Sequence, residues 1–206
     1  MSGIGRWRSS LRAAGCGLRT GEIFGLEWDD IDFEQREIRV RRQLKVSAGR
    51  GPYFGPTKTK TSVRTVEMPE IVRSALVAHE AAVPGVSIEV SDDTDPARPV
   101  RRMASPIFVN EGGQLVRPSW WWQVWSAMIA ETGLSGAINL RALRHYFATV
   151  LIFGGANVKT VQLAMGHTTP TITLNTYVGY WPDAVDRTRS LVDAAFCTQS
   201  VPGQVA

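Results

Sequence analysis

The chain has 206 residues, of which 44% are hydrophobic and 20% charged, as expected for one folded domain with a buried core. This composition excludes a disordered tail, a collagen-like repeat and a small disulfide-stapled protein. Two cysteines indicate reduced thiols. Neither an apolar run of about 18 residues nor a secretory signal is present, so we expect a soluble, cytoplasmic protein.

Positive charge is concentrated in one segment of the chain. Residues 36–64 carry nine basic side chains and one acid, a net charge of +8, while the whole chain carries +4, which leaves −4 for the remainder. A basic segment on a slightly acidic body is typical of a polyanion-binding site. A solvated charged face is the alternative interpretation.

The first third of the chain predicts two short helices followed by strands. The helices are expected over residues 6–14 and 21–28, and an alternation of apolar and basic side chains runs from Glu37 to Val46. A Gly- and Pro-rich turn over residues 49–56 then leads to a second strand over residues 63–68. We expect a small antiparallel sheet with one apolar face and one basic face.

The middle of the chain predicts a helix that begins at Pro69 and ends near residue 83. Residues 84–106 are rich in Pro, Asp, Ser and Arg without a period, which predicts a surface loop. Residues 107–116 predict a hairpin, and Ser119 is the expected cap of a helix that ends before Gly133.

The last third is predicted to be helical, with four helices expected over residues 140–153, 157–166, 169–177 and 182–195. The overall prediction is an α+β fold, mostly helical with a small antiparallel β-sheet or hairpin. One domain is expected over residues 1–196, with a flexible tail over residues 197–206.

Four motifs follow one another along this chain. They are Gly-Leu-Arg-x-x-Glu, which ends at Glu22; a basic hairpin with the pair Lys58-Thr59; Leu-Arg-His-x-Phe-Ala-Thr around Arg144; and Gly-His, with a tyrosine ten residues after His167. In this order, over residues 6–193, they resemble the catalytic domain of tyrosine recombinases, the phage integrase family. The combination is specific, whereas a lone Gly-Leu-Arg is weak evidence.

This resemblance implies a DNA breaking-rejoining catalytic domain that performs site-specific recombination or integration, as integrases of phages, prophages and other mobile elements do. Strands are cleaved and rejoined through a 3′-phosphotyrosyl intermediate. Double-stranded DNA at recombination sites is the implied partner, with self-association as a tetramer on DNA. No cofactor is implied, and no ATP is needed because the enzyme linkage retains the energy of the phosphate bond. No metal is implied either, and the sequence shows no carboxylate cluster typical of a metal site.

The resemblance assigns Arg19 and Arg144 as the pair that clamps the scissile phosphate. Guanidinium groups suit this task because they bind phosphate through two hydrogen bonds and keep their charge as the transition state gathers negative charge. A surface salt bridge is the ordinary alternative for an isolated arginine.

The implied nucleophile is Tyr177, which attacks phosphorus and releases a 5′-hydroxyl. Tyr180 is the rival, but the ten-residue spacing from the Gly-His motif favours Tyr177. Lys58 and Lys60 compete as the acid that protonates the leaving 5′-oxygen. Lys58 is preferred because it begins the Lys-Thr pair, and Lys60 then becomes a contact to the DNA backbone.

His167 occupies the position of a phosphate-bonding residue, with a histidine that caps the helix as the alternative. Glu22 matches a residue that orients the first arginine. His145 belongs to the Arg144 motif but is usually structural, so it is left out of the catalytic set. Further contacts to DNA are expected from the basic face of the sheet, at Arg39, Arg41, Lys60 and Arg64.

The chain departs from the family pattern at Arg141, where the motif usually has histidine. Arginine can donate to a phosphate but cannot act as a neutral base near pH 7. Only 18 residues precede Arg19, so the helical domain that closes over DNA in family members is expected to be missing. Two alternatives therefore stand beside a recombinase: an impaired remnant that only binds DNA or partner protomers, and a relaxase of topoisomerase type.

Overall fold

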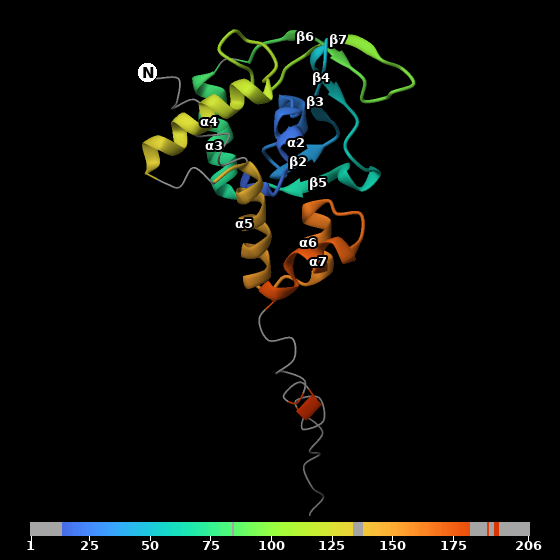
Figure 1. The fold of residues 1–206 in the computed structure, drawn as a ribbon, viewed down its shortest axis with the longest axis vertical. Helices are drawn as coiled ribbons and strands as arrows, with labels where there is room; N and C mark the ends of the chain where they lie inside the picture. Colours follow the sequence, from blue (N-terminus) through green and yellow to red (C-terminus); the bar gives the residue numbers. More distant parts are fainter. Residues whose placement is uncertain (1–13, 84, 134–137, 182–188, 190–191, 194–206) are drawn as a thin grey trace, which may run out of the picture.

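The computed structural model describes residues 14–83, 85–133, 138–181, 189 and 192–193 (Figure 1). Within these ranges it contains six α-helices and two small sheets, which confirms the expected α+β class. The helices expected over residues 6–14 and 182–195 and the tail over residues 197–206 fall almost entirely outside them. No described helix is long and apolar enough to cross a membrane.

The first described elements are a 3-10 turn, η2 (Ala14–Cys16), and the helix α2 (Thr20–Phe24). The helix is shorter than predicted because it ends at Gly25, where the backbone packs directly against that of Gln43: a Cβ at Gly25 would lie 2.8 Å from the Gln43 Cα. A second 3-10 turn, η3 (Trp28–Asp30), follows.

The first sheet has the order β1-β2-β5 and is antiparallel. Its strands are β1 (Ile31–Asp32), β2 (Glu37–Val40) and β5 (Arg64–Glu67). Ile38, on the central strand, faces Ile31 on one side and Val66 on the other. The strands expected around residues 38 and 66 are therefore present and paired.

A second sheet was not predicted. It has the order β3-β4-β6-β7, and its members are β3 (Gln43–Ser47), β4 (Gly51–Gly55), β6 (Ile88–Asp92) and β7 (Val100–Ala104). β4 runs parallel to β6, and the other pairs are antiparallel. The expected single alternating strand is thus wrong, because the chain leaves the first sheet between β2 and β3.

The surface loop expected over residues 84–106 is also wrong. Its centre is the β6–β7 hairpin, in which Val90 and Ala104 are buried. The charged residues of the hairpin hide its alternation in the sequence, and pairing between β4 and β6 holds it to the rest of the protein.

The longer helices agree closely with the prediction. They are α3 (Glu70–Ala82), α4 (Pro118–Thr132), α5 (Leu140–Phe153), α6 (Val158–Met165) and α7 (Pro170–Tyr177), followed by the 3-10 turn η5 (Val178–Tyr180). The side chains of Asn139 and Asn157 cap α5 and α6 by accepting backbone N–H groups. Ser119 is not a cap, because Pro118 already begins α4.

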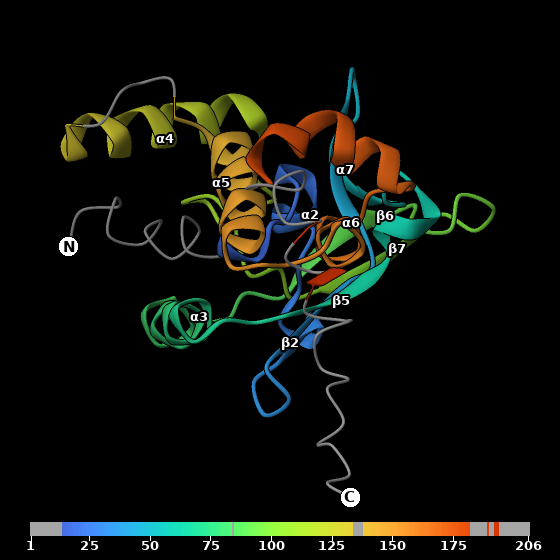
Figure 2. The same ribbon diagram turned by 90° about the horizontal axis from the view of Figure 1, so that it is seen from below.

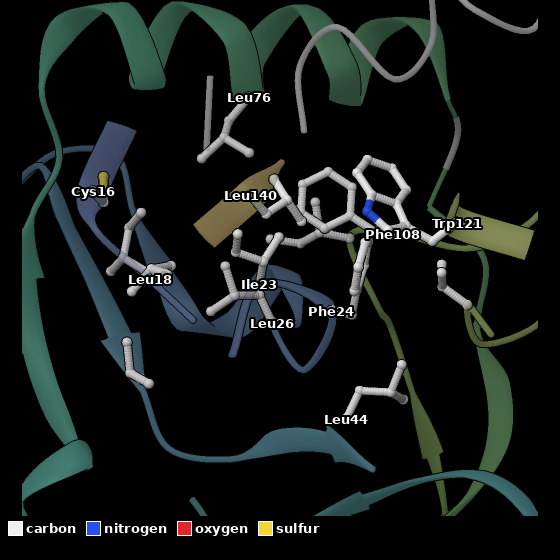
Figure 3. Close-up of a cluster of buried hydrophobic side chains, with 14 of the residues drawn as sticks. Cys16, Leu18, Ile23, Phe24, Leu26, Leu44, Leu76, Phe108, Trp121 and Leu140 are labelled. Carbon is white, nitrogen blue, oxygen red and sulfur yellow. The ribbon is translucent and has the colours of Figure 1, made fainter. Parts of the chain in front are cut away.

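Two apolar cores hold these elements together. The larger joins α2, both sheets, α3 and α4, and Figure 3 shows Leu76 reaching from α3 toward Ile23 and Leu140. The smaller lies among α5, α6 and α7 and is formed by Ala148, Ile152, Val161, Met165 and Tyr177. Figure 1 places these three helices together, on the opposite side of α2 from the β6–β7 hairpin, and Figure 2 views the molecule from the side of these helices.

Candidate active site

The six side chains that the sequence singles out for catalysis line one cleft. The cleft has a volume of about 510 Å³ and opens between the start of α2, the loop after β4, and the helices α5 and α7. The six residues on its wall are Arg19, Lys58, Arg141, Arg144, His167 and Tyr177. The fold therefore gathers all four sequence motifs at one place.

Arg19 is held by three acceptors from separate parts of the chain. Its Nη1 donates to Glu22 Oε1 at 2.6 Å and to Ser62 Oγ at 2.9 Å, and its Nη2 donates to the Gly166 carbonyl at 2.9 Å. Gly166 closes α6 in the left-handed conformation, with φ at +61°. The Gly-His motif therefore supplies a carbonyl that fixes the first arginine.

Arg144 is anchored in the same manner. It is 9% exposed, and its two terminal nitrogens donate to the carbonyls of Gly17 and Met165. Gly17 also has positive φ, and the Phe147 ring packs so closely against it that it occupies the place of a Cβ. Burial, with a further contribution from the Arg19 charge, lowers the pKa of Arg144 to about 10, so the group remains charged at pH 7.

Behind the two arginines lies a buried ion pair between Glu22 and Arg64. Glu22 is 1% exposed, and its Oε2 accepts Arg64 Nη2 at 3.1 Å. Burial alone would raise the pKa of Glu22, but Arg64 and hydrogen bonds from Arg19 outweigh it and hold that pKa below its usual value. Glu22 thus stays ionised and positions Arg19.

Arg64 does not belong to an exposed basic face. Its side chain is 8% exposed, and besides Glu22 it donates to the carbonyls of Ser62 and Ala164. The expected contact between Arg64 and DNA stays a prediction, and in this structure the side chain joins β5, α2 and the end of α6.

The rest of the basic segment is partly neutralised. Arg39 pairs with Asp32 at 2.9 Å, and Arg41 donates to Asp30 at 2.6 Å, although both arginine side chains remain about half exposed. These acids precede the segment in sequence, so the count over residues 36–64 missed them. Lys60, in the 3-10 turn η4 (Lys60–Ser62), is exposed and has no acidic partner among the described residues.

His167 is fixed by one ring nitrogen. Its Nδ1 lies 2.8 Å from Oγ1 of the buried Thr173, which leaves Nε2 as the nitrogen that can meet a ligand in the cleft. Burial, together with the charges of Arg144 and Arg19, lowers the pKa of His167 to about 4. The ring is therefore neutral at pH 7 and can donate a hydrogen bond to an anion.

Tyr177 ends α7 and is 2% exposed, with its ring inside the smaller core. Its hydroxyl lies 2.8 Å from Nδ1 of His145, which also lines the cleft. Burial raises the pKa of Tyr177, against the opposing charges of Arg144 and Arg141. Tyr180, the rival nucleophile, is half exposed and does not line the cleft.

The sequence reasoning left His145 out of the site. One signal was available: His145 lies four residues after Arg141, so the two side chains share a face of α5. Arg141 is exposed at the cleft, and in the described part of the chain its guanidinium has no hydrogen-bond partner. Lys58 is likewise exposed at the opposite wall.

The arrangement has a definite chemical capacity. Two anchored guanidinium groups and a neutral imidazole present hydrogen-bond donors that suit a phosphate group. A phenol stands beside them as a nucleophile, and an ammonium group stands across the cleft. These are the groups required for attack on a phosphodiester and protonation of the leaving oxygen.

Comparison with known proteins gives consistent matches. Residues 11–180 match the model of the phage integrase family. The tyrosine recombinase XerC-like protein of Caldanaerobacter subterraneus is 32% identical over 185 residues, which cover 84% of this chain and 45% of that protein. The prophage integrase IntR of Escherichia coli is 29% identical over 179 residues, covering 81% and 41% respectively.

Among solved structures, the integrase of transposon Tn1549 in complex with transposon right end DNA is similar. Its TM-score is 0.74 at 26% identity, and the match covers 94% of this chain and 59% of that one. The chain spans about half the length of the curated relatives it matches.

Proposed function

The chain belongs to the phage integrase family of tyrosine recombinases, and on that basis we propose that it cleaves and rejoins DNA strands in site-specific recombination or integration. One observation supports this proposal most directly: Arg19, Lys58, Arg141, Arg144, His167 and Tyr177 line a single cleft. The family motifs are therefore combined with a geometry suited to their chemistry.

Each group has a proposed role. Arg19, Arg144 and His167 bind the scissile phosphate, and Tyr177 attacks phosphorus to form a 3′-phosphotyrosyl link. Lys58 protonates the 5′-oxygen as it leaves, and rejoining reverses these steps. Lys58 is preferred to Lys60 because Lys58 lines the cleft, whereas Lys60 is free to contact the DNA backbone.

The proposed partner is double-stranded DNA at recombination sites, bound by residues 1–196 as one catalytic domain. A DNA complex of the Tn1549 integrase supports this choice of ligand. Exchange of strands between two duplexes requires several active sites, so we propose assembly into a tetramer on DNA. A cytoplasmic location fits this activity and the free thiol of Cys16.

A covalent-trapping assay tests the proposal. Nicked duplexes with randomised flanks lose the short 5′-hydroxyl fragment after cleavage, so the enzyme remains linked to DNA. We expect an adduct on a denaturing gel that is absent with Tyr177→Phe and present with Tyr180→Phe, the matched control. DNA that is retarded in a low-salt native gel without any adduct would contradict cleavage and favour a remnant that only binds DNA.

A further inference from the structure

We propose that His145 is the base that accepts the proton of Tyr177 during cleavage. Arg141, which stands where the motif usually has histidine, cannot play this role. This inference rests on the proposed function, because it assigns one proton transfer in that reaction. It is carried by geometry: the imidazole of His145 contacts the one atom of Tyr177 that must lose a proton.

The contact between the two side chains is direct. Tyr177 Oη lies 2.8 Å from His145 Nδ1, which is within the range for an O–H···N hydrogen bond. The centroids of the two rings are 5.5 Å apart, and the ring planes are tilted by 55° to one another. His145 is fixed to α5 and Tyr177 to α7, and both helices bound the smaller core, so the pair is held by packing.

The surroundings of the His145 ring keep it ready to accept a proton. Burial first, and then the charges of Arg141 and Arg144, lower the pKa of His145, so the ring is neutral at pH 7. With its own proton on Nε2, the ring presents the Nδ1 lone pair to the Tyr177 hydroxyl. A charge on His145 would in turn lower the pKa of the neighbouring His167.

Cleavage moves one proton from Tyr177 to His145 and one from Lys58 to the leaving oxygen. The Tyr177 O–H bond breaks as the oxygen–phosphorus bond forms, and the proton moves to His145 Nδ1 to give an imidazolium. The bond from phosphorus to the 5′-oxygen breaks, and this oxygen takes a proton from Lys58. In rejoining, Lys58 recovers its proton from the attacking 5′-hydroxyl, and His145 returns its proton to Tyr177. Because a phenol is a much weaker acid than an imidazolium, the transfer accompanies attack rather than preceding it.

Arg141 then has a separate part in the site. Its charge lies close enough to Tyr177 to lower the pKa of the hydroxyl, although burial outweighs this effect. A guanidinium cannot take up the proton. Electrostatic support for Tyr177 and acceptance of its proton are therefore divided between two residues, one helical turn apart on α5.

The test uses the full chain and a pooled library of nicked duplexes in which the bridging 5′-oxygen at the cleavable position is replaced by sulfur. A thiolate leaves without a proton, so this substrate removes the need for Lys58 and isolates loss of the Tyr177 proton. His145→Asn is the informative variant, because its side-chain oxygen can occupy the place of Nδ1 but is not basic. Tyr146→Phe, at an exposed neighbour on α5, is the matched control.

We expect His145→Asn to form the adduct about 10²-fold more slowly with both oxygen and sulfur substrates. Lys58→Ala should be slow with oxygen alone, and Tyr146→Phe should match the unchanged protein. The double variant Arg141→His, His145→Asn should form the adduct at least tenfold faster than His145→Asn alone. Adduct formation by the unchanged protein on the sulfur substrate should also be slower in D₂O, a readout that does not depend on any variant.

Three results would overturn the inference. An adduct rate for folded His145→Asn within threefold of the unchanged protein would remove the proton-accepting role and leave the proposed function standing. If His145→Asn does not fold, equal rates of adduct formation in H₂O and D₂O by the unchanged protein on the sulfur substrate would also remove the proton-accepting role. No adduct with any substrate would overturn the proposed function and the inference with it.

Discussion

Replacing Gly166 by alanine should destabilise the protein far more than the same change at Gly133. Both glycines end a helix in the left-handed conformation, with φ at +61° and +68°. Each substitution therefore carries the backbone strain of a side chain in that region, about 1–2 kcal/mol. Around Gly133, no described atom lies within 4 Å of the added Cβ.

At Gly166 the added Cβ would lie 2.8 Å from Arg64 Nη1 and 3.0 Å from its Cζ. This guanidinium cannot swing away freely, because it donates to Ser62, Glu22 and Ala164. Losing one hydrogen bond that involves a charged group costs about 1.5–3 kcal/mol. The expected loss for Gly166→Ala is therefore about 2.5–5 kcal/mol, which exceeds the Gly133→Ala loss by about 2 kcal/mol.

Urea unfolding, followed by tryptophan fluorescence, measures both changes. Equal slopes with a lower midpoint for Gly166→Ala would show that stability falls without a change in the surface exposed on unfolding. If both variants lose the same free energy of unfolding, then Arg64 is not held as described, and its role in joining β5, α2 and the end of α6 is refuted.

Three further predictions concern charged groups. Glu22→Gln should lower the free energy of unfolding by about 3 kcal/mol or more, because it strands a buried Arg64. Because folding lowers the pKa of Glu22, the stabilisation that ionised Glu22 gives the folded protein is complete above pH 4.5 and is lost as the pH falls below that value. Below pH 4.5 the urea midpoint should therefore fall more steeply for the unchanged protein than for Glu22→Gln. Parallel curves of midpoint against pH would contradict this. The ring of His167 should titrate by NMR near pH 4 in the folded protein and near 6.5 in urea, whereas a folded midpoint near 6.5 would show that the ring is not desolvated. Lys60→Ala should reduce the slope of log binding constant against log salt concentration by about one, and an unchanged slope would show that Lys60 makes no phosphate contact.

The elements that the sequence predicted well are those with local signals. The helices α5 and α6 follow an Asn cap and carry helical apolar periods, α7 begins at Thr-Pro, and Gly166 ends α6 as expected. The four motifs likewise identified the residues that meet at the cleft. Such features depend on neighbours within a few residues, which the sequence displays directly.

What the sequence could not show depends on pairing between distant segments. β4 contains Gly51, Pro52 and Gly55, which are typical turn residues, yet its pairing with β3 and β6 makes it a strand. The basic face lost part of its charge because Asp30 and Asp32 return to meet it. These contacts exist only once the chain is folded.

The contact between His145 and Tyr177 belongs to the same class. The spacing along α5 places His145 on the face of Arg141, but it does not say which helix that face meets. Only the packing of α5 against α7 brings the Tyr177 hydroxyl to the ring.

The central claim is that Tyr177 becomes covalently linked to DNA. The direct measurement is mass spectrometry of the trapped adduct after nuclease and protease digestion, with fragmentation to locate the modified residue. The account predicts a nucleotide joined through its 3′-phosphate to Tyr177. A nucleotide on Tyr180, or joined through a 5′-phosphate, would contradict it.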